Sequence, residues 1–368
     1  MKIIVLVAGA RAGLEFFQSL LDGHKEVLQL PGTIHFNKSL IKLLSIKSKK
    51  KLAKEFIKKY PLFFDSRKSY VERHNMLGNN KNSFFIIDKQ KFIKNFINLN
   101  RGKQKYKDKL FNNLYLIYKA YNFKTIKCNK KVFIINAHTF EYVKNFNNYF
   151  KNLKYEIIHT IRHPYSAISS TVKNWLRYKN GAVLTPNQLY YNLENIFFGI
   201  SNLQKLKKKI YIIQLENLHI NFNVVMNKFC KMYNLKFSKV LRKSTFHNLK
   251  WWGDKISGKN LNGINNKFKA SYDLNYFSSK DILYYQKLYK NGFEKYHYKK
   301  LSGKILHYCF SPFKCEYIVW KNTIINFRIK HIISIPIFFL KRIIYFNFIL
   351  KNKSKLPPSI GLAKNESF

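Results

Sequence analysis

A short turn near the start of the chain has the residues needed to hold an anion. Gly9 and Gly13 bracket Arg11, and the turn follows an apolar run and precedes a stretch with helical spacing. A loop ending at a helix start offers backbone N–H groups and a positive dipole end, and glycines let the backbone approach an anion closely. The turn therefore predicts a phosphate- or sulfate-binding loop, although a simple tight turn would use the same glycines.

This loop lacks the residues that a nucleoside-triphosphate site requires. Such a loop reads G-x-x-x-x-G-K-[ST], in which Lys contacts the terminal phosphates and a hydroxyl binds magnesium. Here the spacing is G-x-x-x-G, Arg11 is the cation inside the loop, and Leu14 and Glu15 follow it. We expect a site for a phosphate or a sulfate without a metal ion, which disfavours a kinase.

A second anion site is indicated by Arg162, Pro164 and Ser170. Arg162 follows the apolar run Glu156–Ile161, and Pro164 is suited to the first turn of a new helix. Ser170 would then lie about two turns into that helix, where its hydroxyl and the Arg162 guanidinium can converge on one anion. Taken separately, the two residues are equally consistent with a surface ion pair and an ordinary helix serine.

Four stretches of the chain resemble the sulfotransferases that use 3′-phosphoadenosine 5′-phosphosulfate (PAPS). "RAGLEFFQSLLDGH" is similar to the 5′-phosphosulfate loop of that family, and "RHPYSAISS" matches its 3′-phosphate motif. "VFIINAHTFEYV" resembles the segment that carries the catalytic histidine, and "IIQLENLHINFNVVMNKFCKMYNL" a later strand–helix stretch. The four occur in the family's order within about the first 240 residues.

The resemblance implies transfer of a sulfuryl group from PAPS to a hydroxyl or amine of an acceptor. Relatives of this layout suggest a carbohydrate or glycolipid as that acceptor. The 3′-phosphate would be held by Arg162 and Ser170. The residues that would hold the 5′-phosphosulfate are Arg11 and the N–H groups of Ala12, Gly13 and Leu14.

His138 falls on the position of the catalytic base in this resemblance. A base must take the proton of the acceptor, and an imidazole that titrates near neutrality suits that task. A structural or capping role beside Thr139 is the alternative. The usual Lys and Thr before the histidine are Asn136 and Ala137 here.

The loop departs from the family pattern at three positions. Ala12 and Leu14 stand where hydroxyl residues are usual, and each lost donor costs roughly 0.5–1.5 kcal/mol if nothing replaces it. Glu15 would repel a bound sulfate unless it points away or serves as the base itself. These departures leave open a second interpretation, a catalytically degenerate P-loop protein that binds polyanions or anionic lipid.

A later segment, Ser244–Gly258, combines tryptophans, glycines and lysines. It resembles the loop that covers the nucleotide or lines the acceptor cleft in this family, with Trp252 as the residue that would stack on the cofactor. A plain hydrophobic plug fits the same residues.

The alternation of apolar runs and helical stretches predicts how these groups are positioned. We expect strands at Lys2–Ala8, Val132–Ile135, Glu156–Ile161 and Ile210–Leu215. Helices are expected at Leu14–Leu21, Asn37 to about Tyr60, Asp108–Phe123, from Pro164, Asn187–Leu206 and Phe222–Tyr233. This order predicts a P-loop NTPase-like, three-layer α/β/α fold with a mainly parallel central sheet. Ligands of such sheets bind beyond the carboxyl ends of the strands, where the candidate residues lie.

The overall composition is a weaker guide. The chain has 68 Lys and Arg against 18 Asp and Glu, a net charge of +50, but lysine is spread over almost every segment. That spread favours a general compositional bias over a dedicated polyanion surface, so no specific nucleic acid is expected. The four cysteines have no metal- or redox-site spacing, and we expect a cytoplasmic protein.

The C-terminal part differs from the rest. We expect a P-loop domain over 1–300 and a basic, apolar and helical extension over 301–368. Within the extension, Ile332–Leu350 is mostly apolar but is interrupted by Lys341 and Arg342, which disfavours a transmembrane helix. It could lie on an anionic membrane surface, peripheral to the inner membrane, or pack as a helix on the main domain.

Overall fold

A parallel sheet forms the centre of the molecule. The computed structural model describes residues 1–9, 11–68, 74–123, 128–177, 184–255, 260–268, 270, 272–298, 310–326, 329–351 and 356–361. Within them the main sheet has five strands in the order β2-β3-β1-β4-β5, and all neighbouring pairs are parallel. The strands are β1 (Lys2–Ala8), β2 (Val27–Leu28), β3 (Val132–His138), β4 (Glu156–Ile161) and β5 (Lys209–Gln214).

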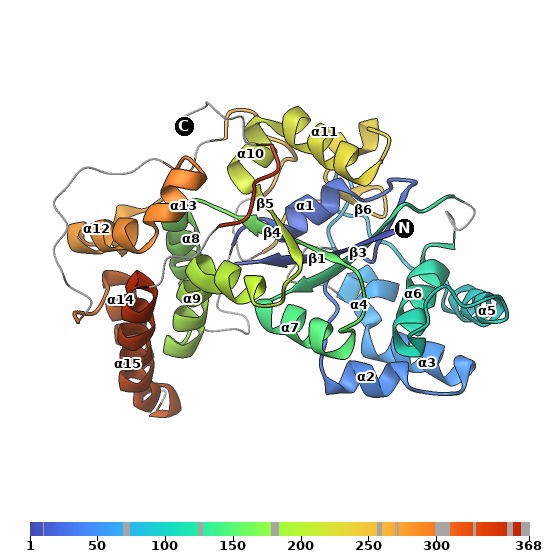
Figure 1. The fold of residues 1–368 in the computed structure, drawn as a ribbon, viewed down its shortest axis with the longest axis horizontal. Helices are drawn as coiled ribbons and strands as arrows, with labels where there is room; N and C mark the ends of the chain where they lie inside the picture. Colours follow the sequence, from blue (N-terminus) through green and yellow to red (C-terminus); the bar gives the residue numbers. More distant parts are fainter. Residues whose placement is uncertain are drawn as a thin grey trace.

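Helices cover both faces of this sheet, and the predicted three-layer α/β/α fold is confirmed. In Figure 1, α1 and α11 lie above the sheet and α7 lies below it. The α-helices are α1 (Leu14–Leu20), α2 (Lys38–Leu44), α3 (Lys49–Lys59), α4 (Pro61–Phe64), α5 (Lys89–Asn100), α6 (Lys109–Tyr121), α7 (Phe140–Tyr149), α8 (Pro164–Arg177), α9 (Pro186–Gln204), α10 (Leu215–Ile220), α11 (Phe222–Tyr233), α12 (Ser279–Leu288), α13 (Lys290–Lys295), α14 (Lys314–Ile325) and α15 (Ile329–Lys351).

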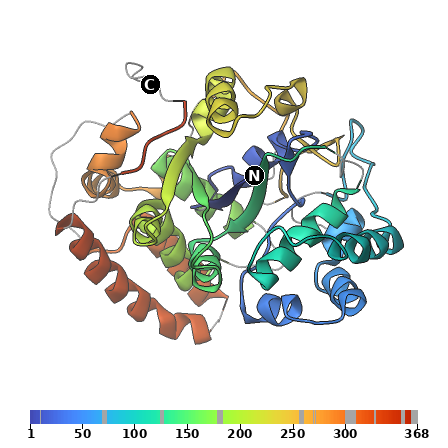
Figure 2. The same ribbon diagram turned by 45° about the vertical axis from the view of Figure 1, so that its right-hand side comes forward.

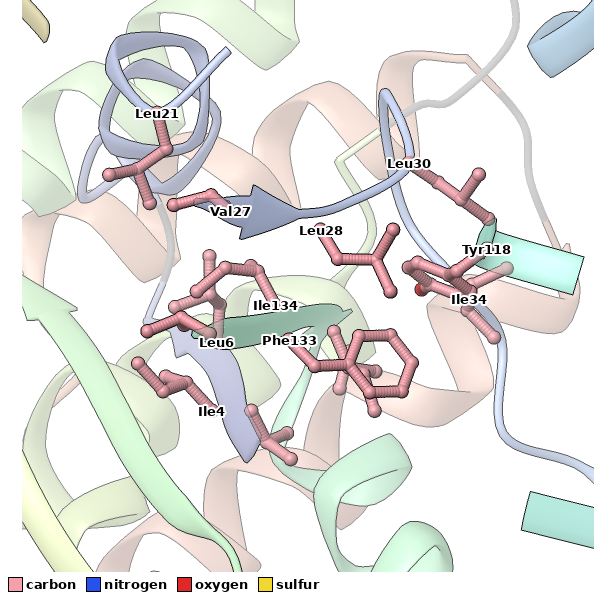
Figure 3. Packing of buried hydrophobic residues seen from close by; sticks show 14 of the residues in the cluster. Ile4, Leu6, Leu21, Val27, Leu28, Leu30, Ile34, Tyr118, Phe133 and Ile134 are labelled. Atoms are coloured by element: carbon pink, nitrogen blue, oxygen red, sulfur yellow. The ribbon is translucent and has the colours of Figure 1, made fainter. Parts of the chain in front are cut away.

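The main core holds β1 in the middle of the sheet. Ile4 and Leu6 of β1 and Phe133 of β3 are fully buried, and Tyr118 of α6 packs beside them (Figure 3). β-branched and aromatic residues suit strands buried on both faces, which explains why the apolar runs form the inner strands. This packing fixes the carboxyl ends of β1, β3 and β4 next to one another.

Two details differ from the sequence-based expectation. The stretch from Asn37 to Tyr60 forms two helices, because the Ser48 side chain accepts a hydrogen bond from the Lys51 N–H and starts α3 anew. The first helix ends at Leu20, one residue before the expected end, and Leu21 is its cap residue.

A second core joins the C-terminal helices to the rest of the chain. It contains buried residues of α8 and α9, such as Ile168 and Leu193, together with Val319 of α14 and Phe346 of α15. Figure 2 shows α14 and α15 at the end of the molecule opposite to α2–α6. The expected domain boundary at 300–301 lies outside the described residues. Within the described helices, none combines the length and the apolar run that crossing a bilayer requires.

The last described segment, 356–361, returns to the edge of the sheet. The Ile212 N–H of β5 donates to the Pro358 carbonyl at 3.0 Å, and the Ile360 N–H donates to the Ile212 carbonyl at 2.8 Å. Ile360 is buried in the main core. The segment therefore covers β5 on its outer side.

Candidate functional site

The predicted strand exits meet at one cavity of about 1170 Å³. That volume is at the upper end of the range for small-molecule sites and is sufficient for a nucleotide with part of a second substrate. The predicted site residues that line it are Arg11, Ala12, Gly13, Leu14, Glu15, His138, Arg162 and Ser170. Trp252 is not among the lining residues.

The loop after β1 has a tightly constrained backbone. Arg11 and Gly13 have positive φ angles of 57° and 77°. A Cβ atom on Gly13 would lie 2.5 Å from Leu215 Cδ1, so a side chain here would require Leu215 to move and would adopt a strained φ, which favours glycine. The N–H groups of Ala12, Gly13 and Leu14 donate no hydrogen bond to any described residue. An anion at the start of α1 could accept from them.

A neighbouring histidine positions the beginning of this loop. The Gly9 N–H donates to Nε2 of His159, on β4, at 3.2 Å. Burial lowers the pKa of His159 to about 3, so the ring is neutral at physiological pH and can accept this bond. No sequence pattern indicates this role, because His159 stands alone in an apolar strand.

Arg11 bridges the loop to a distant segment. Its Nη1 lies 3.2 Å from Oδ1 of Asp254, and both side chains are mostly covered, with 16% and 19% of their surface exposed. Asp254 belongs to the Ser244–Gly258 segment, of which residues 256–258 are not described. An anion bound to the loop would compete with this carboxylate for the guanidinium.

Arg162 and Ser170 are brought together as the spacing predicts. Arg162 directly follows β4 and Ser170 lies in α8, and both face the same cavity. Burial lowers the pKa of Arg162, the charge of Glu216 opposes this shift, and the charge of Arg11 adds to it. Both guanidinium groups line the same cavity, which gives it a positive lining.

Arg162 and Ser170 both keep hydrogen-bonding capacity that a ligand could use. Within the described residues, the buried Nε of Arg162 has no hydrogen-bond partner. The Ser170 Oγ accepts from Nδ2 of Asn174 at 3.0 Å and can still donate its own proton. Glu216 lies beneath them and accepts from the His163 N–H at 2.9 Å, which makes it a support of this turn.

His138, the last residue of β3, and Glu15, in the first turn of α1, form a close pair. Nδ1 of His138 lies 2.8 Å from Oε1 of Glu15. The histidine side chain is 48% exposed and the glutamate 21%. Burial disfavours the charged ring, but the charge of Glu15 and the hydrogen bond outweigh it and raise the pKa of His138 above its ordinary value.

The contact with His138 shows where the Glu15 carboxylate points. Burial raises the pKa of Glu15, but the charge of His138 and the hydrogen bond lower it more, so the net direction is down. Glu15 is directed at Nδ1 of the histidine, and this contact does not involve Nε2. Asn136, by contrast, is buried and donates to Gln18 Oε1, so it does not substitute for a lysine in the cavity.

His219 is a lining residue that no sequence pattern indicated. His219, in α10, is stacked between Phe16 and Phe268, with ring centroids 4.4 and 4.6 Å apart. Its Nδ1 accepts from the Asn265 N–H at 3.2 Å, and burial together with the charge of Arg162 lowers its pKa to about 4. The neutral ring extends an aromatic wall on the side of the cavity nearest Arg162.

The two tryptophans of the Ser244–Gly258 segment, Trp251 and Trp252, have different environments. Trp252 donates from its indole Nε1 to the Gly78 carbonyl at 2.7 Å, and the Lys250 ammonium lies 3.8 Å from its ring centroid. Trp251 and Gly253 line the cavity instead.

In the described part of the chain, no three His, Cys, Asp or Glu side chains gather in a way that could hold a metal ion.

Comparisons with known proteins give few matches. No family model and no curated protein matches the chain. Among solved structures, the chain is similar to the sulfotransferase domain from the curacin biosynthetic pathway, with 13% identity and a TM-score of 0.36. That match covers 88% of this chain and 97% of the other. With so low a score, the fold assignment rests on the strand order of the chain itself.

Proposed function

We propose that this protein is a sulfotransferase that moves a sulfuryl group from PAPS to a hydroxyl or amine of a carbohydrate or glycolipid. The observation that carries this proposal is the convergence of three groups on one cavity. These groups are the glycine loop with Arg11, the pair Arg162 and Ser170, and the pair His138 and Glu15.

The donor side needs two anion sites set apart by a nucleoside. The N–H groups of the loop and Arg11 suit the 5′-phosphosulfate, and Arg162 with Ser170 suits the 3′-phosphate. Arg162 brings a buried Nε without a partner in the described residues, which a phosphate oxygen would satisfy. A donor with a 3′-phosphate fits this arrangement, and a nucleoside triphosphate would lack that contact.

The acceptor side needs a base and stabilisation of developing charge. Glu15 holds Nδ1 of His138, so that Nε2 in its neutral form takes the acceptor proton. The acceptor oxygen then attacks sulfur in line with the leaving phosphate, and the S–O bond to that phosphate breaks. Arg11 and the loop N–H groups stabilise the charge that develops on the bridging oxygen.

The polar face of α9 supports a carbohydrate acceptor. Gln188, Tyr191, Asn192 and Asn195 line the cavity from this helix. Amide and phenol groups can both donate to and accept from sugar hydroxyls. Such a wall has the chemistry for a polyhydroxylated substrate.

Calorimetry with 3′-phosphoadenosine 5′-phosphate (PAP) tests the donor assignment. We expect wild type to bind PAP and Arg162→Ala to bind it roughly 10- to 100-fold more weakly, since a hydrogen bond to a charged group contributes about 1.5–3 kcal/mol. Arg101→Ala, an exposed residue after α5, is the matched control and should bind as wild type does. Equal affinity of the two variants, or no binding of PAP by wild type, would refute the assignment.

One observation favours the second candidate, a degenerate P-loop protein that binds polyanions. The loop positions expected to carry hydroxyls are Ala12 and Leu14, both buried apolar residues, and Arg11 is engaged by Asp254. This candidate predicts salt-sensitive binding to polyanions without any response to PAP.

A further inference from the structure

Helix α15 carries a continuous apolar stripe on its outer side. The residues recur at intervals of four, four, three and four, which places them on one face of a helix. All are largely exposed: Ile329 (71%), Ile333 (64%), Ile337 (48%), Leu340 (57%) and Ile344 (69%). Single exposed aliphatic side chains are ordinary, but an aligned row of five on one helix marks a surface that another apolar phase covers.

A buried ion pair on the opposite side fixes the rotation of this helix. Arg342 is fully buried, and its Nε and Nη2 donate to Glu316 of α14 at 2.8 and 3.0 Å. Its guanidinium also lies 4.2 Å from the ring centroid of Phe313. Arg342 is two residues from both Leu340 and Ile344, about 200° away around the helix. Turning the stripe inward would expel Arg342 from this site, so the stripe is held towards solvent.

The neighbouring helix enlarges the apolar surface. Ile324 and Ile325 at the end of α14 are 52% and 63% exposed, and Tyr317 is 60% exposed. α14 and α15 form a hairpin at one end of the molecule (Figure 1 and Figure 2). The exposed residues of the hairpin thus include aliphatic side chains and an aromatic ring, as in helices that lie in the headgroup region of a bilayer.

The exposed charged side chains of the hairpin itself are of one sign. Lys314, Lys321, Lys330 and Lys341 are exposed on the hairpin. Within 310–326 and 329–351 the acidic residue is Glu316, and it is buried against Arg342. No exposed carboxylate therefore opposes an anionic surface in this described part of the chain. Lysines beside a membrane that carries anionic lipid each contribute about 1 kcal/mol of attraction.

We propose that the α14–α15 hairpin docks on the surface of an anionic phospholipid membrane. The apolar stripe inserts at the boundary between headgroups and acyl chains, and the flanking lysines contact lipid phosphates. A second copy of this chain fits the stripe less well, since pairing two hairpins would bring their exposed lysines together without any carboxylate between them. This proposal does not depend on the activity of the cavity.

Flotation with phospholipid vesicles tests the proposal on the full-length protein. Wild type should bind vesicles of phosphatidylcholine mixed with phosphatidylglycerol and should not bind phosphatidylcholine alone. Replacing two stripe residues, Ile333→Gln with Leu340→Gln, should weaken binding about tenfold or more, because two buried aliphatic side chains are lost from the membrane. Lys321→Gln with Lys330→Gln should weaken it to a similar degree.

A matched control tests whether vesicle binding depends on this surface or on exposed aliphatic residues in general. Val224→Gln with Leu62→Gln replaces exposed aliphatic residues on other helices, and it should bind vesicles as wild type does. All three double variants alter exposed side chains, and unchanged thermal unfolding will show that each is folded. Failure of wild type to bind anionic vesicles, or equal binding by the stripe variant and its control, would overturn the proposal. So would a stable dimer in sedimentation that the stripe variant dissociates, since the stripe would then face a second copy.

Discussion

Replacing Gly13 with alanine tests whether the phosphate loop depends on the conformation described here. The residue has φ 77°, and a left-handed conformation costs an alanine about 1–2 kcal/mol. The added Cβ would also lie 2.5 Å from Leu215 Cδ1 and 3.2 Å from Leu215 Cγ. Overlap of this kind costs about 1–3 kcal/mol in a packed site. The end of a leucine can rotate away, so the lower part of that range applies here. We expect a total loss of about 2–3 kcal/mol.

Urea unfolding of wild type and Gly13→Ala measures this loss as a lower midpoint at unchanged slope. Gly292→Ala is the matched control, because Gly292 lies within α13 and its Cβ would be 3.6 Å from the nearest atom, Tyr289 Cδ1. Alanine should be neutral or slightly stabilising there. A Gly13→Ala variant within about 0.5 kcal/mol of wild type would refute the reasoning. The loop would then tolerate a side chain, and its glycine would not be required by the fold.

Two further predictions concern charged pairs. Glu15→Gln removes the carboxylate that raises the pKa of His138, so the NMR titration of that ring should move to lower pH; an unmoved titration would contradict the pairing. The folded pKa is raised, so the stability from this pair is fully present below the ordinary value of 6.5 and is lost as pH rises through the folded pKa. Arg342→Met should cost about 3–5 kcal/mol in urea unfolding because it strands Glu316. Adding Glu316→Gln, which keeps an oxygen for the Phe313 N–H, should recover much of this, and a double variant as unstable as the single one would argue against the pair.

The sheet could be predicted from the sequence because its inner strands are buried on both faces. Such strands must be continuous apolar runs, and Lys2–Ala8 and Glu156–Ile161 have that pattern at the observed bounds. Parallel strands have their carboxyl ends at the same edge of the sheet. The sequence therefore predicts that Arg162 and His138 lie near the glycine loop.

Contacts between distant segments could not be predicted in this way. The pairing of Arg11 with Asp254 joins residues 243 positions apart, and no local pattern encodes it. The stacking of His219 between Phe16 and Phe268 depends likewise on the packing of three segments. The periodicity of the C-terminal apolar stretch indicated a helix, but its outward side is decided by the buried Arg342, which the sequence presented only as a charge interrupting the stretch.

Residues 356–361 bring the chain back from the C-terminal helices to β5. Five peptide links join Lys351 to Leu356 and can span at most about 18 Å, so the C-terminal end of α15 is tethered close to the sheet. Two backbone hydrogen bonds at Ile212 hold this segment to β5. The same hydrogen bonds occupy polar backbone groups of an edge strand that would otherwise be open to pairing with a foreign strand. This six-residue segment thus occupies part of the sheet edge at which another strand could pair.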